Sequence, residues 1–268
     1  MKKGLVLFDY DGTLVDERQQ IYVPTALTKK AISTLQDQGY LCMLATGRAL
    51  SYIPQGAKDL YLDGYITCNG AYVTAHGKEI LNDALEDAQV EALTSYFDQH
   101  QINYILESKE YCFVKNLKDP EYLHFLDNYK IPENNYVQYK GISQVKGLVS
   151  KITLVFQTME QLHKTVELLS EDFEVSVHRN CKTFDIGKKG MNKGVGVKAV
   201  IDYYNLPFDH TYAFGDGDND VALLASVKYG IAMGIYHPSL EPVLYMVTDT
   251  VKDEGIDHAL RKLNVLKG

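Results

Sequence analysis

Two aspartates, Asp9 and Asp11, directly follow a short apolar run at residues 5–8. Such a run is typical of a strand buried on both faces, and open α/β sheets bind ligands beyond the carboxyl ends of their strands. Alternation along an extended segment directs both carboxylates to one side, and Gly12 lets the chain turn sharply after them. Carboxylates this close need a cation between them or a retained proton. A D-x-D-G stretch taken alone favours a plain turn.

Three further stretches carry polar groups at the ends of predicted elements. They are Thr46-Gly47-Arg48 after a strand at residues 41–45, Lys193 at a helix start, and Gly215 to Asp220 after a strand at residues 211–214. Because the carboxyl ends of parallel strands share one edge of a sheet, we expect these groups to converge.

The five carboxylates at these places indicate a hard cation. They belong to Asp9, Asp11, Asp216, Asp218 and Asp220. Oxygen ligands without histidine or cysteine favour Mg²⁺ over zinc. A lysine and a hydroxyl beside a metal suit a phosphoryl group, and a carboxylate nucleophile can form an aspartyl-phosphate.

The elements that must position these groups follow two patterns. Buried strands that end in polar turns alternate with helices over residues 1–82 and again over residues 187–268, which predicts an α/β core with a Rossmann-like, doubly wound parallel sheet. Residues 83–186 read instead as tyrosine-rich α+β structure. We therefore expect one α/β core domain with a second, α+β domain inserted in it.

The composition of the chain limits the kinds of binding partner that we expect. The chain has 268 residues, 46% of them apolar, with a net charge of -8 and no long basic block, so we expect no nucleic-acid and no membrane partner. The cysteines are Cys42, Cys68, Cys112 and Cys181, and their scatter predicts buried free thiols. The apolar run before Asp9 is too short for a signal peptide, so we expect a cytoplasmic protein. Monomer and homodimer both stay open.

Taken together, the four motifs resemble the haloacid dehalogenase superfamily of phosphohydrolases, and the Cof-like subgroup in particular, over the whole chain. The four motifs are Asp9-Tyr10-Asp11-Gly12-Thr13, Thr46-Gly47-Arg48, Lys193 within Gly190-Met191-Asn192-Lys193-Gly194, and Gly215-Asp216-Gly217-Asp218-Asn219-Asp220. Each motif is weak alone, but their order and spacing together are specific. The stretch Gly234 to His237 departs from a small turn common in the subgroup.

The resemblance implies a role for each motif residue. Asp9 is expected to be the nucleophile, Asp11 the general acid and then base, and Lys193 the group that neutralises Asp9 and the phosphate. Mg²⁺ is implied as the cofactor, held by Asp9, the Asp11 main-chain carbonyl and Asp216, with Asp220 orienting Lys193 or metal-bound water. The implied phosphate-binding residues are Gly12, Thr46, Gly47, Lys193 and Asn219.

For several other residues the sequence allows two alternative roles. Asn69-Gly70 matches a subgroup turn near the substrate or is a plain turn, and Arg48 reaches a second anionic group or makes a surface salt bridge. Asp218 is expected to be a solvated turn residue. His178, Arg179 and Lys182 are candidates for substrate specificity or a solvated strand end. The aromatic residues Tyr104, Tyr111 and Phe113 are expected to pack in the cap rather than stack on a ligand.

The position of the cap in the sequence favours hydrolysis over phosphomutase chemistry. Only 34 residues separate Asp11 from Thr46, whereas 146 separate Thr46 from Lys193, so the second interval holds the cap. We expect a Mg²⁺-dependent phosphatase of small phosphorylated metabolites such as sugar phosphates, flavin precursors or pyridoxal phosphate. Phosphotransferase or phosphomutase chemistry and a non-catalytic phosphometabolite sensor are the alternatives.

Overall fold

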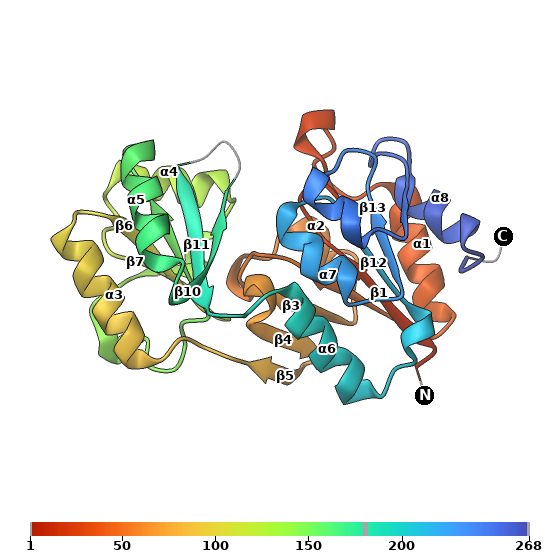
Figure 1. The fold of residues 1–268 in the computed structure, drawn as a ribbon, viewed down its shortest axis with the longest axis horizontal. Coiled ribbons are helices and arrows are strands. Elements are labelled where there is room, and N and C mark those ends of the chain that lie inside the picture. The colour runs from red at the N-terminus through yellow and green to blue at the C-terminus, as the bar shows by residue number, and fades with distance from the viewer. Residues whose placement is uncertain (1, 179–181, 267–268) are drawn as a thin grey trace. The chain divides into compact units, whose positions relative to one another are not determined.

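The computed structural model describes residues 2–178 and 182–266, which form two compact units (Figure 1). The core unit contains the described residues within 1–47, 54–81 and 192–268. The second unit contains residues 48–53 and the described part of 82–191. Residues 48–53 thus pack with the second unit, although the sequence pattern placed them in the core.

One eight-stranded sheet supports the core unit. Its strands are β1 (Gly4–Phe8), β2 (Tyr40–Ala45), β3 (Gly64–Thr67), β4 (Tyr72–Ala75), β5 (Lys78–Asn82), β12 (Thr211–Gly215), β13 (Tyr229–Ala232) and β14 (Met246–Val247). Their order is β14-β13-β12-β1-β2-β3-β4-β5. β1 lies parallel to both β12 and β2, and the chain winds outward from this centre on both sides. The predicted Rossmann-like, doubly wound α/β core is confirmed.

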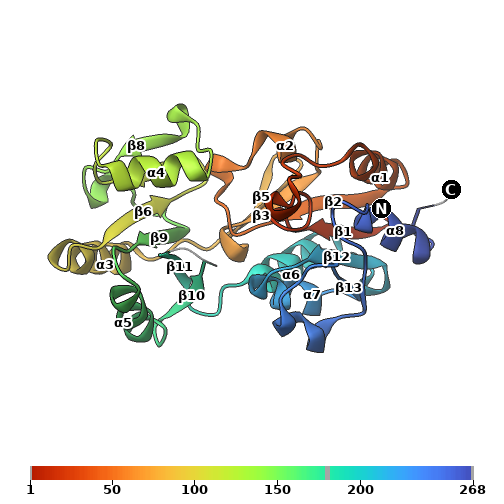
Figure 2. The same ribbon diagram turned by 90° about the horizontal axis from the view of Figure 1, so that it is seen from above.

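Helices cover both faces of this sheet. Figure 2 shows α1 (Ala26–Asp37) on one face and α6 (Lys193–Tyr204) with α7 (Val221–Ala225) on the other. The short α2 (Gln55–Lys58) follows the second motif, and α8 (Gly255–Lys262) packs against α1. Leu5 and Leu7 join the cluster that contains Val197 of α6. Because β1 is covered on both faces, all of its residues are buried, which explains the continuous apolar run before Asp9.

The sheet extends beyond the predicted parallel strands. β4 pairs antiparallel with β3, and β5 forms the edge of the sheet beyond β4. The sequence pattern did not predict these two strands. Lys78 and Glu79 of β5 are exposed, so the strand lacks the apolar run that revealed the buried strands.

The second unit is built on a six-stranded sheet in the order β10-β11-β9-β6-β7-β8. Its strands are β6 (Asn103–Glu107), β7 (Cys112–Val114), β8 (Tyr136–Gln138), β9 (Lys151–Val155), β10 (Phe173–Val177) and β11 (Thr183–Lys188), and its helices are α3 (Asp87–Gln99), α4 (Pro120–Asn128) and α5 (Met159–Leu169). The sequence pattern gave no signal for β8, which has three residues, none of them fully buried.

The two faces of this sheet have different characters. Residues from alternate positions of β6, β9 and β11, such as Leu106, Leu154 and Phe184, pack with α3 and α5 in one apolar core. The intervening positions carry polar residues such as Glu107 and Lys151, and Tyr52 hydrogen-bonds to both of these.

No helix within the described residues combines the length and apolar character needed to cross a membrane.

Candidate active site

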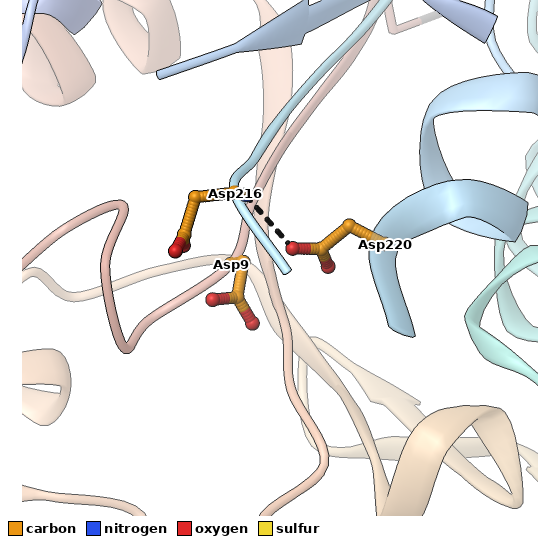
Figure 3. A group of neighbouring side chains, drawn as sticks. All are labelled: Asp9, Asp216 and Asp220. Carbon is orange, nitrogen blue, oxygen red and sulfur yellow. Dashed lines mark hydrogen bonds between the residues drawn. The ribbon is translucent and has the colours of Figure 1, made fainter. Parts of the chain in front are cut away.

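Three carboxylates meet at the carboxyl ends of the two central strands (Figure 3). Asp9 follows β1, Asp216 follows β12, and Asp220 stands at the start of α7. One oxygen from each lies within 4.8 Å of the other two, and all three residues are buried. The convergence arises because β1 and β12 are parallel neighbours, with Phe8 opposite Phe214, so both strands end at the same level.

Lys193 is the buried cation of this cluster. Its Nζ lies 2.6 Å from Asp9 Oδ1 and 2.6 Å from Asp220 Oδ1. Asn192 caps α6 by accepting from the amides of the next turn, so Lys193 is the first helical residue. Burial by itself lowers the pKa of Lys193, but the Asp220 and Asp9 carboxylates raise it above its ordinary value. The side chain is therefore a permanent ammonium at neutral pH.

Asp220 orders the loop after β12. Its Oδ1 accepts from Lys193, and its Oδ2 accepts from the backbone amides of Asp216 and Gly217 at 2.9 and 2.8 Å. Both oxygens are thus engaged by the protein. Asp220 therefore contacts both Lys193 and the backbone of Asp216 and Gly217.

Asp216 is positioned by the first motif. Thr13 Oγ1 donates to Asp216 Oδ1 at 3.1 Å. A Cβ at Gly12, whose φ is +99°, would lie 2.2 Å from Asp216 Oδ2, so only glycine leaves room for this carboxylate. Burial and the Asp220 carboxylate raise the pKa of Asp216 to about 7, against the lowering effects of Arg18 and Thr13.

The cluster holds three carboxyl groups beside the ammonium of Lys193. Burial raises the pKa of Asp9 well above its usual range, Lys193 lowers it in part, and Asp220 and Asp216 raise it again. A further cation beside Asp9 and Asp216 would favour their ionised forms. The donors are carboxylate oxygens, the ligand type that Mg²⁺ prefers, so the residues present fit that ion.

Asp11 differs from Asp9 in its surroundings. It is exposed where Asp9 is buried, and its backbone forms an isolated bridge to Val15.

The ends of β2 and β3 carry the polar groups of the second motif and of the Asn69 turn. The Thr46 amide donates to Ile66, and the Thr46 carbonyl accepts from the Asn69 amide at 3.2 Å. Asn69 has φ 52°, and a Cβ on Gly70, with φ 101°, would lie 2.1 Å from the Asn192 carbonyl oxygen. Glycine at position 70 therefore allows this turn to touch the helix start that presents Lys193.

Asn219 extends the same contact across the sheet edge. Its Nδ2 donates to Asn69 Oδ1 at 3.3 Å, and a Cβ on Gly47 would lie 3.0 Å from that oxygen. Asn69 is therefore a neighbour of Gly47 and Asn219, two of the implied phosphate-binding residues. Asp218 is exposed, as expected of a turn residue. In the divergent stretch 234–237, the His237 amide donates to the Asp216 carbonyl at 2.8 Å.

Arg48 packs within the second unit. Its guanidinium lies 5.4 Å from the ring centroid of Tyr129 and donates to the Tyr129 carbonyl at 3.3 Å. This contact combines a cation–π interaction with a hydrogen bond to the backbone.

The other candidates of the second unit have local partners. His178 Nε2 lies 3.1 Å from Asp185, and Lys182 donates to the Gln157 carbonyl. Tyr104 and Phe113 are buried in the apolar core, whereas Tyr111 is partly exposed. Arg179 and Cys181 lie outside the described residues.

Sequence reasoning missed two residues of this site. Thr13 was quoted only as part of a motif, and Arg18 was not singled out, yet both lie beside Asp216. A signal for Thr13 existed in its place directly after Asp-Gly. None existed for Arg18, because its neighbour Asp216 is distant in sequence.

Three comparisons place these features among known proteins. A family model described as haloacid dehalogenase-like hydrolase matches residues 6–260. The sequence is 30% identical to YkrA of Bacillus subtilis, with 100% of each chain covered. It is 26% identical to the 5-amino-6-(5-phospho-D-ribitylamino)uracil phosphatase YitU of that organism, with 97% of each chain covered. The solved structure of BT1666 from Bacteroides thetaiotaomicron, analysed among HAD superfamily phosphatases, matches with a TM-score of 0.82 at 26% identity, covering 99% of this chain and 96% of that chain.

Proposed function

The chain belongs to the haloacid dehalogenase-like hydrolases, and from that premise we propose that it is a Mg²⁺-dependent phosphatase of small phosphorylated metabolites. The family resemblance expected from the four motifs is confirmed. The single observation that carries the proposal is the buried cluster at the sheet edge, where Asp9 lies 2.6 Å from Lys193 beside the Asp216 carboxylate. A buried carboxylate next to a fixed ammonium suits nucleophilic attack on a dianionic phosphoryl group.

In the first half-reaction Asp9 is the nucleophile. One Asp9 oxygen attacks phosphorus, and the bond from phosphorus to the leaving oxygen breaks. Asp11 gives its proton to that oxygen, so the alcohol leaves neutral and an aspartyl-phosphate remains. Lys193 holds positive charge beside the reacting Asp9 oxygen throughout, at no cost of reorganisation.

In the second half-reaction Asp11 is the base. It accepts a proton from water, the water oxygen attacks phosphorus, and the bond between phosphorus and Asp9 breaks. Inorganic phosphate leaves, Asp9 is a carboxylate again, and Asp11 is protonated for the next cycle. One carboxyl serves both steps because they move the proton in opposite directions.

We assign Asp9, the Asp11 carbonyl and Asp216 as the residues that hold Mg²⁺, since both oxygens of Asp220 are already engaged. When bound, Mg²⁺ supplies charge neutralisation at the phosphoryl oxygens. We propose that Gly12, Thr46, Gly47 and Asn219 bind the phosphate oxygens. Arg48 and the turn Asn69-Gly70 are proposed to lie beside the rest of the substrate.

The proposed substrates are small and soluble. The second unit, which we propose is the inserted cap, would exclude bulk water during the reaction. Phosphorylated flavin precursors are one candidate class, supported by the name of the relative YitU. Sugar phosphates and pyridoxal phosphate are the other classes. The described cysteines Cys42, Cys68 and Cys112 are buried and free, which supports a reducing, cytoplasmic setting.

The test is release of inorganic phosphate from a panel of phosphorylated metabolites, with Mg²⁺ or with EDTA. We expect Mg²⁺-dependent release, and we expect Asp9→Asn to lower it by more than about a thousandfold. Asp218→Asn is the matched control, because Asp218 is exposed in the same group of loops and should leave the rate unchanged. Full activity of folded Asp9→Asn would contradict the nucleophile. A second phosphorylated product without free phosphate would indicate a transferase, and binding without turnover would indicate a sensor.

A further inference from the structure

A second cation, the guanidinium of Arg18, lies next to Asp216. Arg18 Nη2 lies 3.6 Å from Asp216 Oδ2, the oxygen that does not accept from Thr13. The Arg18 side chain is 45% exposed, whereas that of Asp216 is 6% exposed. A partly exposed guanidinium therefore lies beside a buried carboxylate that we propose binds Mg²⁺.

Asp16 holds Arg18 in this position. Arg18 Nε donates to Asp16 Oδ1 at 2.7 Å, and Nη2 donates to Asp16 Oδ2 at 3.1 Å, so the two planar groups pair edge to edge. Asp16 is buried and also accepts from the Arg18 amide at 3.0 Å, as the N-cap of the short 3₁₀ turn Glu17–Gln19. Two hydrogen bonds from the guanidinium and one from the backbone amide therefore hold Arg18 in one position.

The position of this charge has an electrostatic consequence. A cation beside Asp216 stabilises its carboxylate when no metal is bound, and it repels a divalent cation that binds the same carboxylate. The repulsion is moderate because Arg18 is half exposed and solvent screens its charge.

We propose that Arg18, fixed by Asp16, competes with Mg²⁺ for the Asp216 carboxylate and thereby weakens the metal affinity of the site. The inference rests on the proposed Mg²⁺ site and adds a positioning residue that controls its occupancy. Arg18 acts on the metal through Asp216 and takes no part in the reaction steps.

The test is calorimetric titration of the metal-free full-length protein with Mg²⁺ at low salt. For Arg18→Gln we expect a dissociation constant about threefold to tenfold lower than that of the wild type, in line with one partly screened charge pair. The gain should shrink in high salt. Arg18→Lys keeps the charge and should stay within about twofold of the wild type.

The chain offers a close control in Arg261. It forms the same kind of paired contact with buried Asp257, with Nε and Nη2 donating at 2.6 and 3.1 Å, and its side chain is 48% exposed. Arg261→Gln removes an equivalent ion pair from α8, so the Mg²⁺ affinity should not change.

Three outcomes would overturn the inference. They are an unchanged or weaker Mg²⁺ affinity in Arg18→Gln, an equal gain in Arg18→Lys, and an equal gain in Arg261→Gln. A wild-type protein that binds no Mg²⁺ would refute the proposed metal site as well, so the two failures are distinguishable.

Discussion

Two lysines in the described chain are each buried between two carboxylates, and their surroundings differ in charge balance. In the core unit, Lys193 Nζ lies 2.6 Å from both Asp9 and Asp220. In the second unit, Lys151 Nζ lies 3.1 Å from Glu107 and 2.8 Å from Asp185. The same local motif therefore occurs once at the candidate active site and once on a sheet face.

The Lys151 cluster is satisfied by its own neighbours. Thr153 Oγ1 lies 2.5 Å from Glu107 Oε1 and 2.7 Å from Asp185 Oδ1, and its single proton can serve only one of them. Burial and the Asp185 carboxylate raise the pKa of Glu107, and Lys151, Thr153 and Tyr52 lower it in part. With Tyr52 donating to Glu107 at 2.8 Å, two hydroxyls and one ammonium serve the two carboxyl groups of this cluster.

The Lys193 cluster contains one carboxyl group more. Asp9, Asp216 and Asp220 lie around one ammonium, and Arg18 Nη2 lies 3.6 Å from Asp216 Oδ2. The lesson is that a buried lysine and two carboxylates do not by themselves mark a site. The third carboxylate makes the difference, because three carboxylate oxygens within 4.8 Å of one another could hold a metal ion.

The largest expected effect comes from Lys193→Met. Removing the ammonium leaves three carboxylates without a buried cation, so phosphate release should fall by more than about a thousandfold. Mg²⁺ should also raise the melting temperature of this variant more than that of the wild type, because the ion replaces lost positive charge. Retained turnover in Lys193→Met would contradict a catalytic role for the Lys193 cluster.

The next effect is on stability and comes from Lys151→Met. Breaking a buried ion pair by removing one partner costs about 3–5 kcal/mol of unfolding free energy, measured by denaturant titration. Mg²⁺ should not restore the loss. The control Lys198→Met removes an exposed pair with Asp202 and should cost less than about 0.5 kcal/mol. A Mg²⁺-dependent rescue of Lys151→Met would show that the second cluster also binds the ion.

The smallest effect is a dependence of stability on pH through Asp185. Burial by itself raises the pKa of Asp185, but His178 and Lys151 lower it well below the ordinary value of 3.8. Well above the unfolded pKa of about 3.9, both the folded and the unfolded states are ionised and the stabilisation is complete. As the pH falls further the unfolded chain binds the proton first, so stability falls, by at least about 1 kcal/mol.

The measurement is the unfolding free energy between pH 6 and pH 3 for the wild type, Asp185→Asn and Asp202→Asn. The acid-side loss should be smaller in Asp185→Asn and unchanged in Asp202→Asn, whose carboxylate is exposed. If the unfolding free energy falls equally with pH in all three proteins, Asp185 does not contribute to the pH dependence of stability.

Sequence reasoning was strongest where a local pattern carries the information. The apolar runs at β1, β2 and β12, each followed by a polar turn, predicted the central strands and the residues at their ends. The sequence pattern did not reveal β4, β5 and β8, which are all short. The residues of β5 and β8 are exposed or only partly buried, and a strand that buries little shows no clear periodic pattern. β4 is largely buried, but it has only four residues.

By itself, the sequence determined the family, the order of the motifs and the carboxylates that follow the central strands. Only the tertiary structure decided that Thr13 donates to Asp216 across 203 residues and that Arg18 lies on the other side of the same carboxylate. Strand register likewise set Glu107 opposite Lys151 and Thr153 opposite Asp185. The physical reason is that such contacts depend on which strands pair and in what register, and no local pattern of residues encodes the partner's position.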